Sequence, residues 1–365
     1  MALTQTTESG SFGVEPAQNT TALARWVSDN WLLLLLGLFL LLLPAVAGEF
    51  VLTQLVGWTL ILGMIALSLM FLAGYGGMVS LAQMTVASVA GYTITVLGAS
   101  SMPTISLFWP WWVAAPLAIA VAVIFGTFAG ILSARTEGIY TIMITLAIAA
   151  AFFYLTLQNY AIFNGFNGFT TIPAPKFWGI NWKDAVPLYY LILFFAALSY
   201  VVVVYVSRTP FGLALQGVRD NPRRMEAIGY NVTAHRVAAY AFAALIAGIG
   251  GILMVWLNNQ ISPGTAGIQA TIYVLVVAVI GGLGHPIGPF VGAFIFVLLR
   301  TFALDLLVAV GLDGRRFQII IGLGFLLIVL FSPDGVVGLW RRWAIRVRGN
   351  GERIGLCCPF SSLTC

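Results

Sequence analysis

The chain has 365 residues, of which 60% are hydrophobic and only 8% are charged, and its formal net charge is +5. This composition requires most of the chain to lie in lipid, and no polar stretch is long enough to form a soluble domain. The arginines collect in a few loops and near the C-terminus, as positive charge retained on the cytoplasmic side would, so they do not indicate nucleic-acid binding. The only two lysines, Lys176 and Lys183, do not follow a glycine, which excludes the G-x-x-x-x-G-K-[ST] phosphate loop.

In chain order, the polar residues 1–30 are expected to form a disordered cytoplasmic N-terminus. A leucine-rich run over 32–43 predicts the first hydrophobic helix, and because A-V-A follows it, cleavage as a signal peptide is the alternative. With spans of about 20 residues, further helices are predicted at 51–73, 78–98, 109–132, 138–158, 186–206, 235–257, 268–283, 287–310 and 316–332.

The pattern therefore predicts an all-α polytopic membrane protein with about ten transmembrane helices, some of them broken at Gly or Pro. The transmembrane domain would cover 31–340, and 341–365 would be a cytoplasmic tail. All three cysteines fall in the last nine residues, so they cannot cross-link the body of the protein.

Two glycine-rich breaks interrupt the hydrophobic pattern, G-Y-G-G-M-V-S-L-A-Q from Gly74 and G-G-L-G-H-P-I-G-P from Gly281. Broken helices in two halves of a chain can mark the substrate path of a transporter. Close packing of small residues at helix crossings would give the same pattern. The candidate residues are Gly74, Gly76, Gly77, Gly281, Gly282 and Gly284.

The segment 287–310 carries Arg300 and Asp305 in an otherwise apolar run. One straight helix would place the arginine near mid-membrane, at a cost of at least ~2.5 kcal/mol. We therefore expect a short helix that ends near Leu299, with Arg300 at the interface.

A loop at 159–185 holds N-G-F-N-G-F-T-T-I-P-A-P from Asn164. Asn-Gly steps make defined turns, so the sequence itself predicts at least a turn here. The alternative is an external docking loop built on Asn164, Asn167 and Gly168.

The longest polar segment between hydrophobic runs is 207–236, with five arginines. Thr209-Pro210 and Asn221-Pro222 each read as an N-cap followed by proline at the first helical position, and Gly229 reads as a helix stop. We expect a short helix over 222–228 outside the membrane that docks a partner. If this loop is cytoplasmic, counting spans places both termini in the cytoplasm.

Catalytic and metal-binding patterns are missing from the sequence. His235 and His285 are isolated, no Cys/His cluster has zinc spacing, and no serine lies in G-x-S-x-G. Glu49 and Glu137 lie at predicted helix ends, so a proton relay is also missing. A chain with a membrane path but no energy source of its own is most simply completed by an ATPase on another chain that docks at 207–236.

At this point the residues resemble a known family. Four blocks, in the family's order, are similar to permease subunits of ABC importers for branched-chain amino acids, specifically the LivM type. They are G-Y-G-G-M-V-S-L-A-Q, E-G-I-Y-T-I-M-I-T-L-A, P-F-G-L-A-L-Q-G-V-R-D-N with E-A-I-G-Y-N-V-T, and G-G-L-G-H-P-I-G-P with F-S-P-D-G-V-V-G-L. The resemblance covers roughly 50–340, and the third block is the most specific. Met78, Ala82 and Gln83 depart from the first block's usual pattern.

The resemblance implies a multi-pass protein of the bacterial inner membrane, surrounded by lipid, without cofactor or metal and without enzymatic activity. Its implied partners are a second permease subunit, two ATP-binding cassette ATPases and a periplasmic amino-acid-binding protein. The E-A-I-G segment is similar to the loop with which importer permeases contact their ATPases. The implied coupling surface is Arg219, Asp220, Arg223, Arg224, Glu226, Ala227 and Gly229.

Three other readings stay open. A related ABC permease for urea, short amides or another small polar solute would share the same blocks. A stand-alone carrier or channel would show gradient-driven flux without partners. A membrane-embedded enzyme is the remaining class, although the sequence shows no catalytic constellation for it.

Overall fold

The computed structural model describes residues 31–98, 106–172, 176–177, 180–182 and 184–309, and the single positions 322, 335, 336 and 338. It divides into two units, 1–47 and 48–365. In the first unit, helix α2 (Trp31–Leu42) is followed by a 3-10 turn (Leu43–Ala45) that has Pro44 in its first turn. The helix predicted at 32–43 is thus confirmed, whereas the predicted disordered N-terminus, the tail and the helix at 316–332 lie outside the described residues, apart from 322.

The second unit begins with a continuous helical span, Val51–Tyr75, made of η2 (Val51–Gly57), α3 (Trp58–Met70) and η3 (Phe71–Tyr75). Its further helices are α4 (Gln83–Leu97), α5 (Trp111–Ser133), α6 (Ile139–Gln158), α7 (Tyr160–Phe163), η4 (Gly165–Asn167), α8 (Ala185–Arg208), α9 (Pro210–Asp220), α10 (Pro222–Ala227), α11 (Val232–Asn258), η5 (Pro263–Ala266), α12 (Ile268–Gly281) and α13 (Gly288–Ala309).

The described part of this unit also contains four strands of two residues each. They are β1 (Phe169–Thr170), β2 (Lys176–Phe177), β3 (Ile180–Asn181) and β4 (Gln260–Ile261). β1 pairs antiparallel with β4, and β2 pairs antiparallel with β3. The fold is therefore an all-α polytopic membrane protein, in which short strands only close the loops.

Among the residues that the structure describes, five helical spans are long and apolar enough to cross a membrane: Val51–Tyr75, α5, α6, α8 and α11. α4 and α12 have only 15 and 14 residues. At 1.5 Å per residue each is about 22 Å long, less than the roughly 30 Å of a bilayer core. Both short helices adjoin a glycine break, as the sequence predicted. The helix expected over 78–98 is nevertheless shorter than predicted, because residues 78–82 are not helical.

The expected helix end near Leu299 is wrong, because α13 continues through Arg300 to Ala309. A Cβ on Gly63 of α3 would lie 2.5 Å from the ring of Phe290, and α13 also packs against η2. Arg300 lies ten residues beyond Phe290, or about 15 Å further along α13. Its exposed side chain is therefore level with η2, at the start of the Val51–Tyr75 span. The helix can therefore continue without placing the cation at mid-membrane.

Small residues let α11 pack closely against α3, α4 and α5 at the centre of this unit. A Cβ on Gly251 would overlap the carbonyl oxygen of Ala87 in α4, and one on Gly126 of α5 would overlap the side chain of Ala244. In a membrane, where lipid is as apolar as leucine, close backbone approach of this kind is a main source of helix association.

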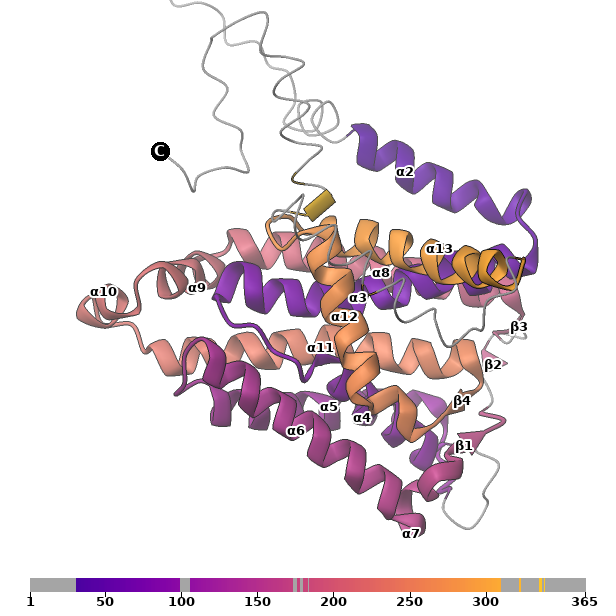
Figure 1. Cartoon of the computed structure of the whole chain (residues 1–365), viewed down its shortest axis with the longest axis horizontal. Coiled ribbons are helices and arrows are strands. Elements are labelled where there is room, and N and C mark those ends of the chain that lie inside the picture. Colours follow the sequence, from indigo (N-terminus) through magenta and orange to yellow (C-terminus); the bar gives the residue numbers. More distant parts are fainter. Residues whose placement is uncertain are drawn as a thin grey trace, which may run out of the picture. The chain divides into compact units, whose positions relative to one another are not determined.

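The helix directions define two ends of the unit (Figure 1). α9 and α10 project from one end, which we call the α9–α10 end. That end also holds the turn between η3 and α4, the α5–α6 turn and the break between α12 and α13. The opposite end holds the strands and is called the strand end.

Candidate functional site

α9 and α10 begin at the N-caps that the local sequence predicted. The backbone N–H of Gly212 donates to Thr209 Oγ1 (3.4 Å), and the N–H of Arg224 donates to Asn221 Oδ1 (3.0 Å). Each cap precedes a proline at the first helical position. Gly229 adopts φ +98°, which a residue with a side chain rarely adopts, so it ends the segment. The predicted helix at 222–228 is confirmed with its end at Ala227.

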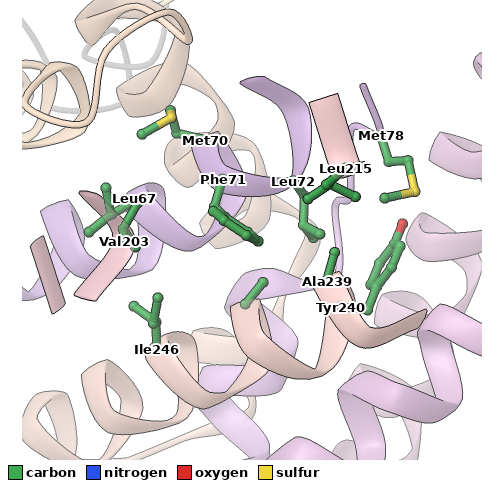
Figure 2. Close-up of a cluster of buried hydrophobic side chains, with 11 residues drawn as sticks. Leu67, Met70, Phe71, Leu72, Met78, Val203, Leu215, Ala239, Tyr240 and Ile246 are labelled. Carbon is green, nitrogen blue, oxygen red and sulfur yellow. The ribbon is translucent and has the colours of Figure 1, made fainter. Parts of the chain in front are cut away.

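α9 is anchored to the membrane-embedded core through one face. Leu215 is fully buried and belongs to a cluster that includes Leu72 and Met78 from the first glycine break (Figure 2). A Cβ on Gly212 would overlap the carbonyl oxygen of Val206, so the turn from α8 into α9 is tight. The loop is therefore a structured extension of α8 and not a free tether.

α10, by contrast, presents its side chains outward. Most of the predicted coupling residues are exposed here: Arg223, Arg224, Glu226, Ala227 and Gly229. Ile228, next to them, is 66% exposed. The surface thus combines cations, one carboxylate and an apolar side chain, and it projects from the α9–α10 end (Figure 1).

Three aromatic rings join this loop to the start of α11. His235 stacks on Phe211 with 5.9 Å between ring centroids, and Tyr230 meets His235 edge-on at 5.4 Å. A force applied to α10 can therefore reach both α9 and α11. The described residues contain no group of three or more His, Cys, Asp or Glu that could hold a metal ion.

Arg219, the first cation of the predicted coupling surface, is oriented inward instead. Its Nη1 donates to the backbone carbonyl oxygen of Gly74, and its Nη2 lies 2.9 Å from Asp220 Oδ1. A Cβ on Gly77 would lie 2.5 Å from Arg219 Cγ. The loop at 207–236 and the first glycine break, which the sequence analysis described as separate features, are thus in direct contact.

The two glycine breaks also meet each other. A Cβ on Gly74 would overlap the carbonyl oxygen of Leu283. Inside the second break, a Cβ on Gly281 would overlap the carbonyl oxygen of Gly288, and one on Gly335 would lie 2.5 Å from the Cα of Gly282. A Cβ on Gly284, however, would have no described atom within 4 Å. Most of these glycines therefore permit close backbone contact. This agrees with the interpretation of the glycine breaks as sites where small residues let segments pack closely.

Buried side chains bond to the non-helical residues 78–82 and to Gln83, the first residue of α4. The N–H of Leu81 donates to Thr145 Oγ1 of α6 at 3.1 Å, and Ser68 Oγ donates to Gln83 Oε1 at 3.1 Å. Ser68, Gln83 and Thr145 are all buried. Irregular backbone at membrane depth requires such internal partners. Sequence reasoning missed Thr145; the signal was threonine at 141, 145 and 156, which helical periodicity places on one buried face of α6.

A second missed feature is the ion pair of Arg236 with Glu137. Arg236 Nη2 lies 2.9 Å from Glu137 Oε1, and its Nη1 donates to the carbonyl oxygen of Ala134 at 3.1 Å. The Arg236 side chain is only 11% exposed, whereas that of Glu137 is 69% exposed. The pair ties the α5–α6 turn to the first helical turns of α11. The sequence placed Glu137 at a helix end but offered no sign of its partner, 99 residues away.

At the strand end, the loop predicted from Asn-Gly steps is held by backbone contacts. Asn164 Nδ2 donates to the carbonyl oxygen of Gly168 at 2.6 Å. A Cβ on Gly168 would overlap the carbonyl oxygen of Ile261, next to the β1–β4 pairing. Asn167 and Phe166 are exposed, with Phe166 at 74%. Asn164 and Gly168 thus serve the turn, and docking through Asn167 stays a prediction.

A pocket of about 340 Å³ lies near the strand end between α5, α8 and α11, with Trp111, Trp182 and Trp256 in its wall. Its lining is wholly apolar. Burying the ammonium and carboxylate of a free amino acid without polar partners is strongly unfavourable. The described lining of this pocket therefore offers no polar partner to either charged group of a free amino acid.

Comparison with known proteins gives a consistent result. The family model described as "Branched-chain amino acid transport system / permease component" matches residues 51–330. The high-affinity branched-chain amino acid permease protein LivM of Salmonella typhimurium is 24% identical over 300 residues, which cover 76% of this chain and 66% of that relative, just under two thirds.

More distant relatives were also found. A probable LivM of Methanocaldococcus jannaschii is 25% identical over 233 residues, covering 60% of this chain and 67% of the relative. The nucleoside ABC transporter permease NupC of Lactococcus lactis is 29% identical over 113 residues, covering 30% and 35%. No solved structure matches the chain.

Proposed function

The chain belongs to the family of permease components of branched-chain amino acid transport systems, and from this premise we propose that it is the transmembrane permease subunit of an ABC importer for branched-chain, hydrophobic amino acids. Separate ATPase subunits drive it, and a second permease and a periplasmic amino-acid-binding protein complete the complex. The relatives named as LivM transport branched-chain amino acids by their description, and their similarity supports the same substrate class here.

The observation that carries this proposal is the contrast within the loop at 207–236. α9 is anchored by buried Leu215, and α10 projects with Arg223, Arg224 and Glu226 exposed. A structured, charged surface at the end of long apolar helices is what a soluble ATPase needs in order to dock. On this assignment the α9–α10 end and both termini are cytoplasmic, and the membrane is the bacterial inner membrane.

The mechanism follows from the connections of this loop. ATP binding brings the two ATPases together, which displaces α10 and, through α9 and the His235 rings, the inner ends of α8 and α11. A ligand-driven shift between two packed arrangements then opens the path to one side at a time. The strand end is periplasmic, and its exposed Phe166 and Asn167 contact the binding protein.

The decisive experiment is purification from the native membrane followed by reconstitution. ATPase subunits and a second permease should co-purify with the chain, and uptake into proteoliposomes should require ATP, the ATPases and loaded binding protein. The chain by itself should hydrolyse no ATP. Gradient-driven flux through the chain alone would instead establish a stand-alone carrier.

A permease for another small polar solute is the second candidate, because a nucleoside permease is among the relatives. Stimulation of ATP hydrolysis by the cognate binding protein separates the two. We expect ATP hydrolysis to be stimulated when the binding protein carries leucine, isoleucine or valine. Stimulation by binding protein that carries urea, a short amide or a nucleoside would assign the transporter to that solute instead.

A further inference from the structure

We propose that Arg219 is a positioning residue that transmits the movement of the coupling loop to the two glycine breaks, and that it is not itself an ATPase contact. This inference rests on the proposed function, since it presumes that an ATPase moves α10. It assigns to Arg219 a task different from that of Arg223 and Arg224, the arginines four and five residues further on in α10.

The first argument is orientation. Arg223 and Arg224 are exposed on α10, whereas the Arg219 side chain is only 28% exposed and reaches back into the protein. Its Cγ lies over Gly77, where any side chain would overlap it, and its Nη1 donates to the carbonyl oxygen of Gly74. A partner that docks on α10 would meet the two outer arginines and leave this one in place.

The second argument is the fit between donor and acceptor. Gly74 lies in the last turn of the span that ends at Tyr75, where carbonyl groups run out of helical N–H partners. The guanidinium supplies a charged donor there, and Asp220 Oδ1 holds the same group through Nε (3.0 Å) and Nη2 (2.9 Å). A planar guanidinium held by two partners transmits a displacement of α9 better than the ammonium group of a lysine, which acts as a point charge.

The third argument is continuity. Gly74 touches Arg219 through its carbonyl oxygen and meets the carbonyl of Leu283 at its Cα. A shift of α9 therefore moves the end of the Val51–Tyr75 span, and that span is in backbone contact with the break between α12 and α13. Close-packed contacts of this kind switch between discrete arrangements and do not deform gradually. The Arg219 side chain thus links the loop to both breaks.

The test compares two chemically identical changes, Arg219→Gln and the matched control Arg224→Gln, in the complete complex reconstituted in proteoliposomes. Two quantities are measured: ATPase subunits retained per permease, and substrate imported per ATP hydrolysed. We expect Arg219→Gln to retain its ATPase subunits while import per ATP falls about tenfold, within the usual range of coupling free energies. Arg224→Gln should lose ATPase subunits. Arg219→Lys should restore part of the import per ATP.

Unchanged import per ATP in Arg219→Gln would overturn the inference, and so would loss of ATPase subunits equal to that of Arg224→Gln. If Arg224→Gln keeps its ATPases, the proposed docking surface fails, yet the import ratio of Arg219→Gln still decides the role of Arg219. Should Arg219→Gln fail to insert, Asp220→Asn replaces it, because Asp220 is 51% exposed and only orients the guanidinium. It should lower import per ATP without loss of ATPases, and a wild-type ratio would refute the proposal.

Discussion

The two ends of the membrane-embedded unit are held together in different ways. At the α9–α10 end, side chains from distant segments contact glycine backbone, as Arg219 does at Gly74 and Gly77. At the strand end, short backbone pairings and a side chain bonded within its own turn hold the loops, as at β1–β4 and Asn164. The first arrangement links elements that can move relative to one another, and the second fixes a loop locally. We therefore expect changes at the first end to alter transport and changes at the second end to alter stability.

The largest effect should come from the exposed residues of the α9–α10 end. Glu226→Lys reverses a charge on the docking surface, and Gly229→Trp places a bulky side chain at φ +98°. Each should abolish uptake while the protein still inserts in the membrane, as measured by uptake into vesicles together with membrane fractionation. Normal transport in both variants would remove the assignment of this surface.

A large loss of stability should follow Gly168→Ala at the strand end. The residue adopts φ +63°, and a Cβ there would overlap the carbonyl oxygen of Ile261. Strain of this kind costs of order 1–3 kcal/mol, so the unfolding midpoint in detergent should fall while the ATPases still co-purify. Gly264→Ala is the matched control, because its nearest atom would be at 3.6 Å. Equal unfolding midpoints for Gly168→Ala and Gly264→Ala would contradict the expectation that changes at the strand end alter stability.

A moderate effect on transport, without loss of stability, is expected for Phe166→Ala. This ring is 74% exposed at the strand end, so its removal leaves no cavity in the core. If it contacts the binding protein, loss of one aromatic anchor should raise the binding-protein concentration needed for half-maximal uptake by about tenfold. Tyr154→Ala, an exposed aromatic of α6, serves as control. An unchanged concentration dependence would exclude Phe166 from the contact.

The smallest effect should be that of Glu137→Gln. The carboxylate bonds Arg236 at 2.9 Å but is 69% exposed, and ion pairs with an exposed partner contribute about 0–1 kcal/mol. Its unfolding free energy should fall by less than about 1 kcal/mol. Arg236→Ala should cost more, because it also removes the bond to Ala134 and a mostly buried side chain. Equal losses of unfolding free energy in Glu137→Gln and Arg236→Ala would show that the Arg236–Glu137 ion pair contributes only through its charges.

Much of the fold follows from local signals. Apolar runs of about 20 residues predict the long spans. The Thr-Pro signal predicts the start of α9, and the Asn-Pro and Gly229 signals predict α10 with its end one residue away from the observed one. The limits of this reasoning appear at 78–82 and at Leu299. Hydropathy alone cannot distinguish a buried non-helical segment from a helix, and it cannot show that Arg300 is level with the end of the neighbouring span.

Which segments are helical, where the loop helices begin, and the lack of a G-x-x-x-x-G-K-[ST] phosphate loop depend on neighbouring residues and composition. The amino-acid order was therefore sufficient for these features. The meeting of Arg219 with Gly74, of Gly74 with Leu283, and of Arg236 with Glu137 joins residues that are 145, 209 and 99 positions apart. Contacts at such separations arise only when helices pack, because packing selects which of many arginines and glycines come together. The tertiary structure therefore decided which residues could connect the coupling loop to the membrane core.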